Sequence, residues 1–174
     1  MSAMKSAAVF LLCMAWAGIS LAEHFTYGDD VVAGVHDEQF SGKHCRISVY
    51  GPTGGSYVSG TYQDPNGELR ISVDRYSYLE VRGSARKVVV TFIDRNSNVN
   101  LEHLKVGTGG IEIHSVNRRS KVDIGESLGH VTLKSVEASS ISVPHGTHVI
   151  GEDRMRDGAR LFFEGRTTQA YVDE

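Results

Sequence analysis

The sequence predicts an all-β protein, built as a single domain from many short strands, and three observations support this prediction. Pairs of apolar residues separated by one residue recur about every ten residues, from Ile47 and Val49 to Leu161 and Phe163. Between the pairs lie Gly, Ser, Asn, Asp and charged residues, which are typical of turns. No window places apolar residues at i, i+3, i+4 and i+7 between capping residues, so no helix is expected.

Two architectures are consistent with short strands at this spacing. A parallel β-solenoid stacks coils of fixed length, whereas an antiparallel β-sandwich connects longer strands through tight hairpins. The step between apolar pairs is even from Lys87 onward, and strands this short bury little area unless similar strands stack on them. We therefore expect the β-solenoid. The turn signal Asp64–Gly67 (DPNG) is typical of a hairpin and keeps the antiparallel β-sandwich as the alternative.

The N-terminus has the pattern of a cleaved signal peptide over residues 1–22. One basic residue, Lys5, precedes an apolar run, and small residues at Ser20 and Ala22 mark a cleavage site before Glu23. The apolar run is too short to span a bilayer. We therefore expect an exported product, periplasmic or extracellular, with no membrane span after cleavage.

The remainder of the chain divides into three predicted segments. Residues 23–44 show little periodicity and are predicted as an irregular lead-in or cap, 45–165 as the β-repeat domain, and 166–174 as a C-terminal tail. Cleavage would remove Cys13 and leave Cys45, so no intramolecular disulfide is expected. The net charge of −3 gives no electrostatic argument for nucleic-acid binding.

A family resemblance rests on residues 98–143 (NVNLEHLKVGTGGIEIHSVNRRSKVDIGESLGHVTLKSVEASSISV), where short "L-x-V" strands alternate with Gly- and Ser-rich bends. This segment resembles the adhesin-type β-solenoids of many exported bacterial proteins. The resemblance implies a right-handed solenoid at the cell envelope. It brings no catalytic residues, and none are predicted here.

The strongest metal candidate is the predicted turn that contains His145 and His148. Two imidazoles in one turn can converge on a zinc ion, with Glu152, Asp153 or His130 as a third ligand. No specific zinc motif is present, and histidines at bends are commonly solvated surface residues.

A second candidate site follows from the solenoid geometry. If one coil contains about 20 residues, Glu80 lies beside Asn100 or Glu102, and these are followed by Asp123 and then Ser142 on one outer face. Such a row can bind calcium or the hydroxyls of a glycan. Its ordinary alternative is a solvated face that keeps the sheet soluble. No cofactor is expected beyond calcium here or zinc at the histidines.

Two further residue groups have structural explanations. Cys45 shares a strand face with Ile47 and Val49, so it is expected to be a buried, inert thiol that His44 cannot activate. A group of tyrosines near the DPNG turn is expected to close the end of the β-core, although exposed tyrosines also bind sugars. This group contains Tyr57, Tyr62, Tyr76 and Tyr78.

These observations predict an exported structural or interaction module of a bacterial cell envelope, with a surface polysaccharide or an envelope protein as its partner. The alternative is a glycan-active or metal-dependent hydrolase that uses the C-terminal histidines and carboxylates. Self-association through exposed terminal coils is a third expectation, because unpaired strand edges recruit other strands.

Overall fold

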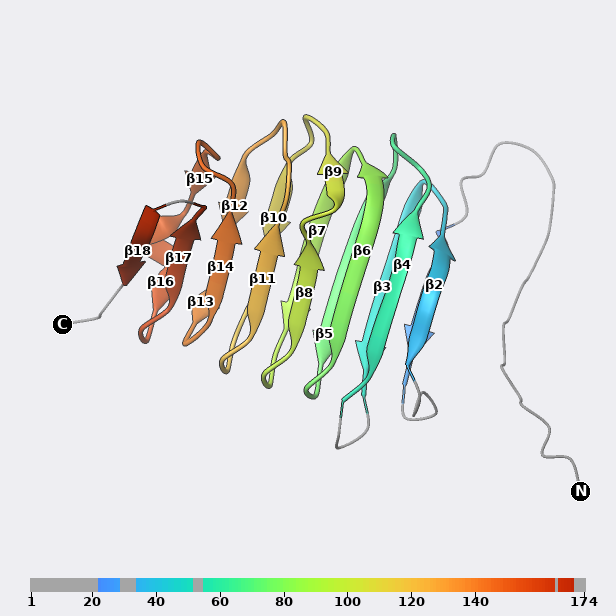
Figure 1. The fold of residues 1–174 in the computed structure, drawn as a ribbon, viewed down its shortest axis with the longest axis horizontal. Coiled ribbons are helices and arrows are strands. Elements are labelled where there is room, and N and C mark those ends of the chain that lie inside the picture. The colour runs from blue at the N-terminus through green and yellow to red at the C-terminus, as the bar shows by residue number, and fades with distance from the viewer. Residues whose placement is uncertain (1–21, 29–33, 52–54, 165, 171–174) are drawn as a thin grey trace, which may run out of the picture.

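The computed structural model describes residues 22–28, 34–51, 55–164 and 166–170, and it shows a parallel β-solenoid of about six turns. Two sheets run along the solenoid and face each other, and successive coils lie side by side along its length (Figure 1). Among the described strands every pairing is parallel except one, between β17 and β18. The expected solenoid is confirmed, and the antiparallel sandwich is excluded.

Most coils contribute one strand to each sheet, and the nine-stranded sheet contains β9 and β18 in addition. The seven-stranded sheet consists, in spatial order, of β1 (His24–Tyr27), β3 (His44–Tyr50), β5 (Glu68–Asp74), β7 (Lys87–Ile93), β10 (Ile111–Ile113), β12 (Val131–Leu133) and β15 (Val149–Ile150). The nine-stranded sheet contains β2 (Val35–Phe40), β4 (Tyr57–Tyr62), β6 (Tyr78–Ala85), β8 (Asn98–Leu101), β9 (Leu104–Val106), β11 (Lys121–Ile124), β14 (Ser140–Val143), β17 (Arg160–Phe163) and β18 (Arg166–Ala170).

Two short elements complete the later coils. A small two-stranded sheet pairs β13 (Val136–Glu137) with β16 (Met155–Arg156), and a 3-10 turn covers Glu152–Arg154. Within the part of the chain that the structure describes, no helix is long and apolar enough to cross a membrane.

The core lies between the two sheets and is built from columns of aligned apolar side chains. Because each strand pairs in register with the strand one coil away, inward residues stack on inward residues. One such column belongs to the nine-stranded sheet and is fully buried, and it contains Leu79, Val99, Val122, Ile141 and Leu161. The apolar pairs in the sequence are the inward residues of these strands.

The regular coils begin at His24 rather than at Cys45. β1 pairs in register with β3, and β2 pairs with β4, so both strands belong to a first coil within residues 23–44. In β2 the register shifts between Val35 and Glu38, and Asp37 has a positive φ of 56°. This irregularity interrupts the alternation of apolar and polar residues, which explains why the sequence shows no strand there.

The DPNG turn forms a corner and not a hairpin. The N–H of Gly67 donates to the carbonyl of Asp64 at 3.0 Å, and the N–H of Asn66 donates to the Asp64 carboxylate at 3.0 Å. These bonds produce the expected tight turn, but the turn connects β4 of one sheet to β5 of the other. The residues of a β-turn determine that the chain changes direction, but they do not determine which sheet the next strand joins.

The opposite corners, which precede β6, β8, β11 and β14 at the lower edge of Figure 1, each contain a buried serine: Ser77, Ser97, Ser120 and Ser139. The hydroxyl oxygen of each serine accepts a hydrogen bond from the backbone N–H of the serine one coil earlier, at 3.2 Å for Ser77 to Ser97, 3.3 Å for Ser97 to Ser120 and 3.1 Å for Ser120 to Ser139. The two residues before the serine have positive φ in three of these corners: Arg75 and Tyr76, Arg95 and Asn96, and Arg118 and Arg119.

Candidate ligand-binding face

The predicted row of polar residues lies on the outer face of the nine-stranded sheet. The strand register places Glu80 of β6 beside Asn100 of β8, and Asn100 beside Asp123 of β11, with Ser142 of β14 next. All four residues are partly exposed. Since neighbouring strands lie about 4.8 Å apart, the polar row spans about 14 Å.

Glu102 lies outside the polar row. It follows β8 in an exposed turn, and its backbone N–H donates to the side-chain oxygen of Asn100 at 2.9 Å. Of the two residues that the sequence offered beside Glu80, the register therefore selects Asn100. The backbone of Glu102 helps to fix the orientation of the Asn100 amide.

Cations and hydroxyls on neighbouring columns hold the carboxylates of the polar row. The guanidinium of Arg82 contacts Glu80 at 2.8 Å, and the hydroxyl of Tyr57 donates to the other Glu80 oxygen at 3.2 Å. The hydrogen bond from Arg82 is the main cause of a lowered pKa for Glu80. Lys121 contacts Asp123 at 2.9 Å. Glu80 is therefore ionised at neutral pH, and a cation lies beside each of the two carboxylates of the polar row.

Two stacked tyrosines lie directly beside the polar row. The rings of Tyr57 and Tyr78 are 5.1 Å apart and nearly parallel, at 4°, and the ring of His36 lies 5.0 Å from Tyr57 on the first coil. Burial is the main cause of a raised pKa for Tyr78, and a hydrogen bond with Asn100 opposes it. The hydroxyls of the stack therefore contact Glu80 and Asn100, and the partly exposed rings lie next to the polar row.

The other two tyrosines of the predicted end-closing group lie elsewhere. Tyr62 is buried, and its hydroxyl donates to the carbonyl of Gly42 at 2.7 Å, whereas Tyr76 is 55% exposed in a serine corner. At the N-terminal end, the rings of Phe25 and Phe40 meet edge to face, with centroids 5.2 Å apart. Phe25, Phe40 and Tyr62 therefore close this part of the core, and Tyr57 and Tyr78 do not.

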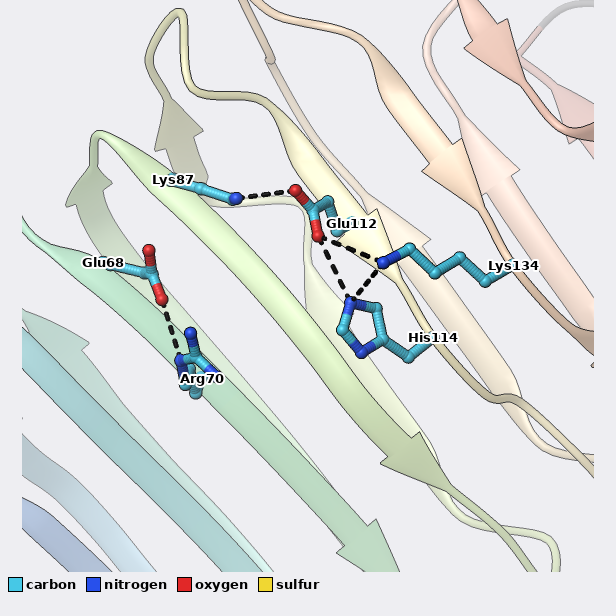
Figure 2. A network of polar contacts seen from close by, with 6 residues as sticks. All are labelled: Glu68, Arg70, Lys87, Glu112, His114 and Lys134. Carbon is cyan, nitrogen blue, oxygen red and sulfur yellow. Dashed lines mark hydrogen bonds and ion pairs between the residues drawn. The ribbon is translucent and has the colours of Figure 1, made fainter.

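A charged network on the outer face of the seven-stranded sheet surrounds Glu112 (Figure 2). Lys87 contacts one Glu112 oxygen at 2.6 Å, and His114 and Lys134 contact the other at 3.2 and 3.7 Å. The hydrogen bond from Lys87, followed by that with His114, lowers the pKa of Glu112 to about 2. Glu68 and Arg70 form a separate pair at 2.8 Å on β5. The members of this network come from three coils, so their spacing in the sequence does not reveal it.

The structure pairs His148 with His130, and it places His145 apart from them. The Nδ1 atoms of His130 and His148 lie 2.8 Å apart, and His145 is exposed in the turn before β15. Within the described ranges, no group of three or more His, Cys, Asp or Glu residues is arranged to hold a metal ion. Zinc or calcium binding stays a prediction.

Cys45 is a buried thiol, as the strand alternation predicts. It is 1% exposed, and burial is the main cause of a raised pKa of about 12. His44 is exposed on the other side of β3. A thiol with this pKa is protonated at neutral pH and is a poor nucleophile.

A shallow depression lies where β6 and β9 end. Its apolar lining comes from Pro65, Ala85, Val106 and Leu128, and Lys105 and Glu126 also line it. Ser84 adds a hydroxyl to this mainly apolar lining.

These observations describe a parallel β-solenoid that carries polar residues on the outer faces of both sheets. Comparison of the chain with protein-family models, curated proteins and solved structures gives no significant match. The assignment of the fold therefore rests on the strand pairing of the structure.

Proposed function

We propose that this protein is an exported interaction module that binds a polysaccharide of the bacterial cell envelope along the polar row. The observation that supports this proposal is the register of β6, β8, β11 and β14, which repeats a polar side chain at every strand spacing. A linear polymer with repeating hydroxyls can meet such a row at several successive units. A weak contact at each unit then adds to a useful affinity.

The chemistry of the row suits a neutral or weakly charged glycan. Ionised Glu80 and Asp123 accept hydrogen bonds from sugar hydroxyls, and the amide of Asn100 both donates and accepts. Arg82 and Lys121 donate to ring and hydroxyl oxygens. The edges of Tyr57 and Tyr78 add apolar contact beside the polar groups.

Two expectations from the sequence support a location at the envelope. Residues 1–22 carry the pattern of a signal peptide and lie almost entirely outside the described residues, and residues 98–143 resemble adhesin-type solenoids. We therefore place the module outside the cytoplasm, where surface polysaccharides are its ligands. A hydrolase remains the alternative, and the experiment below separates the two.

The test is a sedimentation assay of the purified protein with a panel of insoluble envelope polysaccharides, with and without calcium or zinc. Bound protein and released sugar are measured together. The Asn100→Ala/Asp123→Ala variant removes the centre of the polar row. Its matched control, Arg46→Ala/Thr132→Ala, removes two outward side chains from the seven-stranded sheet. Circular dichroism checks that both variants fold.

We expect binding without sugar release, weakened at least tenfold in the polar-row variant and unchanged in the control. Equal losses in both variants would overturn the assignment to this face. Absence of binding to the whole panel would overturn the glycan proposal. Sugar release that a chelator abolishes would replace it with the hydrolase.

A further inference from the structure

His130 and His148 form a pair of imidazoles on the seven-stranded sheet. Each residue precedes a strand, and because Val131 pairs with Val149 the two histidines occupy the same position on adjacent coils. The N–H of Val131 donates to the carbonyl of His148 at 3.0 Å, which fixes the two backbones relative to each other. The rings meet edge to face, with centroids 4.5 Å apart at 85°.

The Nδ1 atoms of His130 and His148 are close enough to bind one metal ion together. The Nδ1 atoms lie 2.8 Å apart. Two nitrogens bound to one ion at about 2.0 Å are about 2.8 Å apart at a right angle and about 3.3 Å apart at a tetrahedral angle, and a small rotation of one ring that breaks the present hydrogen bond reaches either separation. Among the divalent first-row metals, Cu²⁺ has the highest affinity for a given set of nitrogen and oxygen ligands, and imidazole is one of the ligands it favours.

Both rings have freedom to adjust. Their residues are exposed, so the ring that donates the present hydrogen bond can rotate until both lone pairs point to one ion. The equivalent position one coil earlier is Gly110, whose N-terminal neighbour is also glycine. No side chain therefore extends from Gly110 beside His130, and water can occupy the remaining coordination positions.

We propose that His130 and His148 bind one Cu²⁺ ion through their Nδ1 atoms, with water as the other ligands. The backbone already holds the two ligands on adjacent coils, so binding orders only side chains. This site differs from the predicted His145–His148 pair. It lies on the other sheet from the polar row and does not depend on the proposed glycan binding.

The test is a calorimetric titration of the untagged full chain with Cu²⁺ in glycine buffer, which competes with binding to single imidazoles. Electron paramagnetic resonance of the Cu²⁺ complex reports the number of bound nitrogens from the protein. His130→Gln and His148→Gln each remove one ligand. His145→Gln, in the same turn, and His114→Gln, on the same face, are the matched controls.

We expect one tight Cu²⁺ per chain, with two imidazole nitrogens in the spectrum. Affinity should fall at least tenfold in His130→Gln and in His148→Gln, and stay within twofold in both controls. A spectrum with one imidazole nitrogen would overturn the proposal. An equal loss in His145→Gln would also overturn it, because binding would then follow the number of histidines.

Discussion

The side-chain oxygen of Ser97 accepts a hydrogen bond of 3.2 Å from the backbone N–H of Ser77, which lies one coil earlier. Ser97 is completely buried, and its own N–H donates to Ser120 at 3.3 Å. These bonds link successive corners in which two residues have positive φ, a conformation that is costly for residues other than glycine. The serine hydroxyls therefore accept hydrogen bonds from backbone N–H groups at these corners, which lie outside the strands.

Replacement of Ser97 by alanine should lower the free energy of unfolding by about 1–3 kcal/mol. The reason is that the N–H of Ser77 would remain buried after the loss of its acceptor. Urea unfolding measures the effect. Ser72→Ala, at a partly exposed outward position of β5, is the control and should change stability by less than about 0.5 kcal/mol. Equal stability of the two variants would contradict a structural role for the serine corners.

Replacement of Gly60 by alanine should destabilise the protein by about 1–3 kcal/mol or more. A Cβ atom at Gly60 would overlap with the carbonyl oxygen of Glu38 and lie 2.5 Å from the ring of Phe40. Both groups belong to the first coil, so the strain would separate β2 from β4. Thermal unfolding measures the change.

Gly28→Ala is the matched control for this substitution. Among the residues that the structure describes, no atom lies within 4 Å of a Cβ built at Gly28, and its φ lies outside the left-handed region. We expect a melting temperature close to that of the unchanged protein. If Gly60→Ala melted at the same temperature as Gly28→Ala, the close approach of Glu38 and Phe40 to Gly60 would be contradicted.

Ionisation of Glu112 should make the stability of the protein depend on pH in the acid range. Its pKa is lowered from an ordinary value of 4.5 to about 2, mainly by the hydrogen bond from Lys87. A carboxylate with a depressed folded-state pKa stabilises the protein above its ordinary pKa. That contribution is lost as the pH falls from about 4.5 to about 2.

The measurement is the difference in melting temperature between the unchanged protein and Glu112→Gln at several pH values. We expect the unchanged protein to melt higher at pH 7 and the difference to close as the pH approaches 2. About 1 M salt should reduce the difference at pH 7, because the contacts are partly exposed. A difference that stayed constant with pH would show that ionised Glu112 is not the stabilising species.

The period of the sequence predicts the fold and part of the polar row. Alternation within strands identifies the inward residues, and a coil of about 20 residues places Glu80, Asp123 and Ser142 on one face. The choice between Asn100 and Glu102 cannot be made in this way. Successive corner serines are 20, 23 and 19 residues apart, so the length of a coil varies.

This variation also explains why the sequence does not reveal the Glu112 network and offers His130 only as one of three possible ligands beside His145 and His148. Lys87 and Glu112 are 25 residues apart and His130 and His148 are 18 apart, although both pairs join adjacent coils. An error of one residue moves a side chain to the other face of its strand. The one available signal was the corner sequence Asp/Asn-Arg-x-Ser, which occurs at residues 74–77, 94–97 and 117–120 and gives the length of two coils directly.

Removal of residues 165–174 should cause the protein to self-associate. β18 pairs antiparallel with β17, with Leu161 opposite Gln169, and so covers the last edge of the nine-stranded sheet. Without β18, the backbone N–H and C=O groups on that edge of β17 are unpaired and available to a strand of another copy. Gel filtration with light scattering over a range of concentrations measures the mass.

The matched control removes residues 171–174 alone and leaves β18 in place. We expect the shorter truncation to behave as the full chain does, and the longer one to form larger species as its concentration rises. A parallel solenoid repeats the same strand spacing at every coil. An uncovered last strand can therefore pair with a strand of another copy as it would with the next coil. If both truncations kept the mass of the full chain at every concentration, β18 would not act as a protective cap.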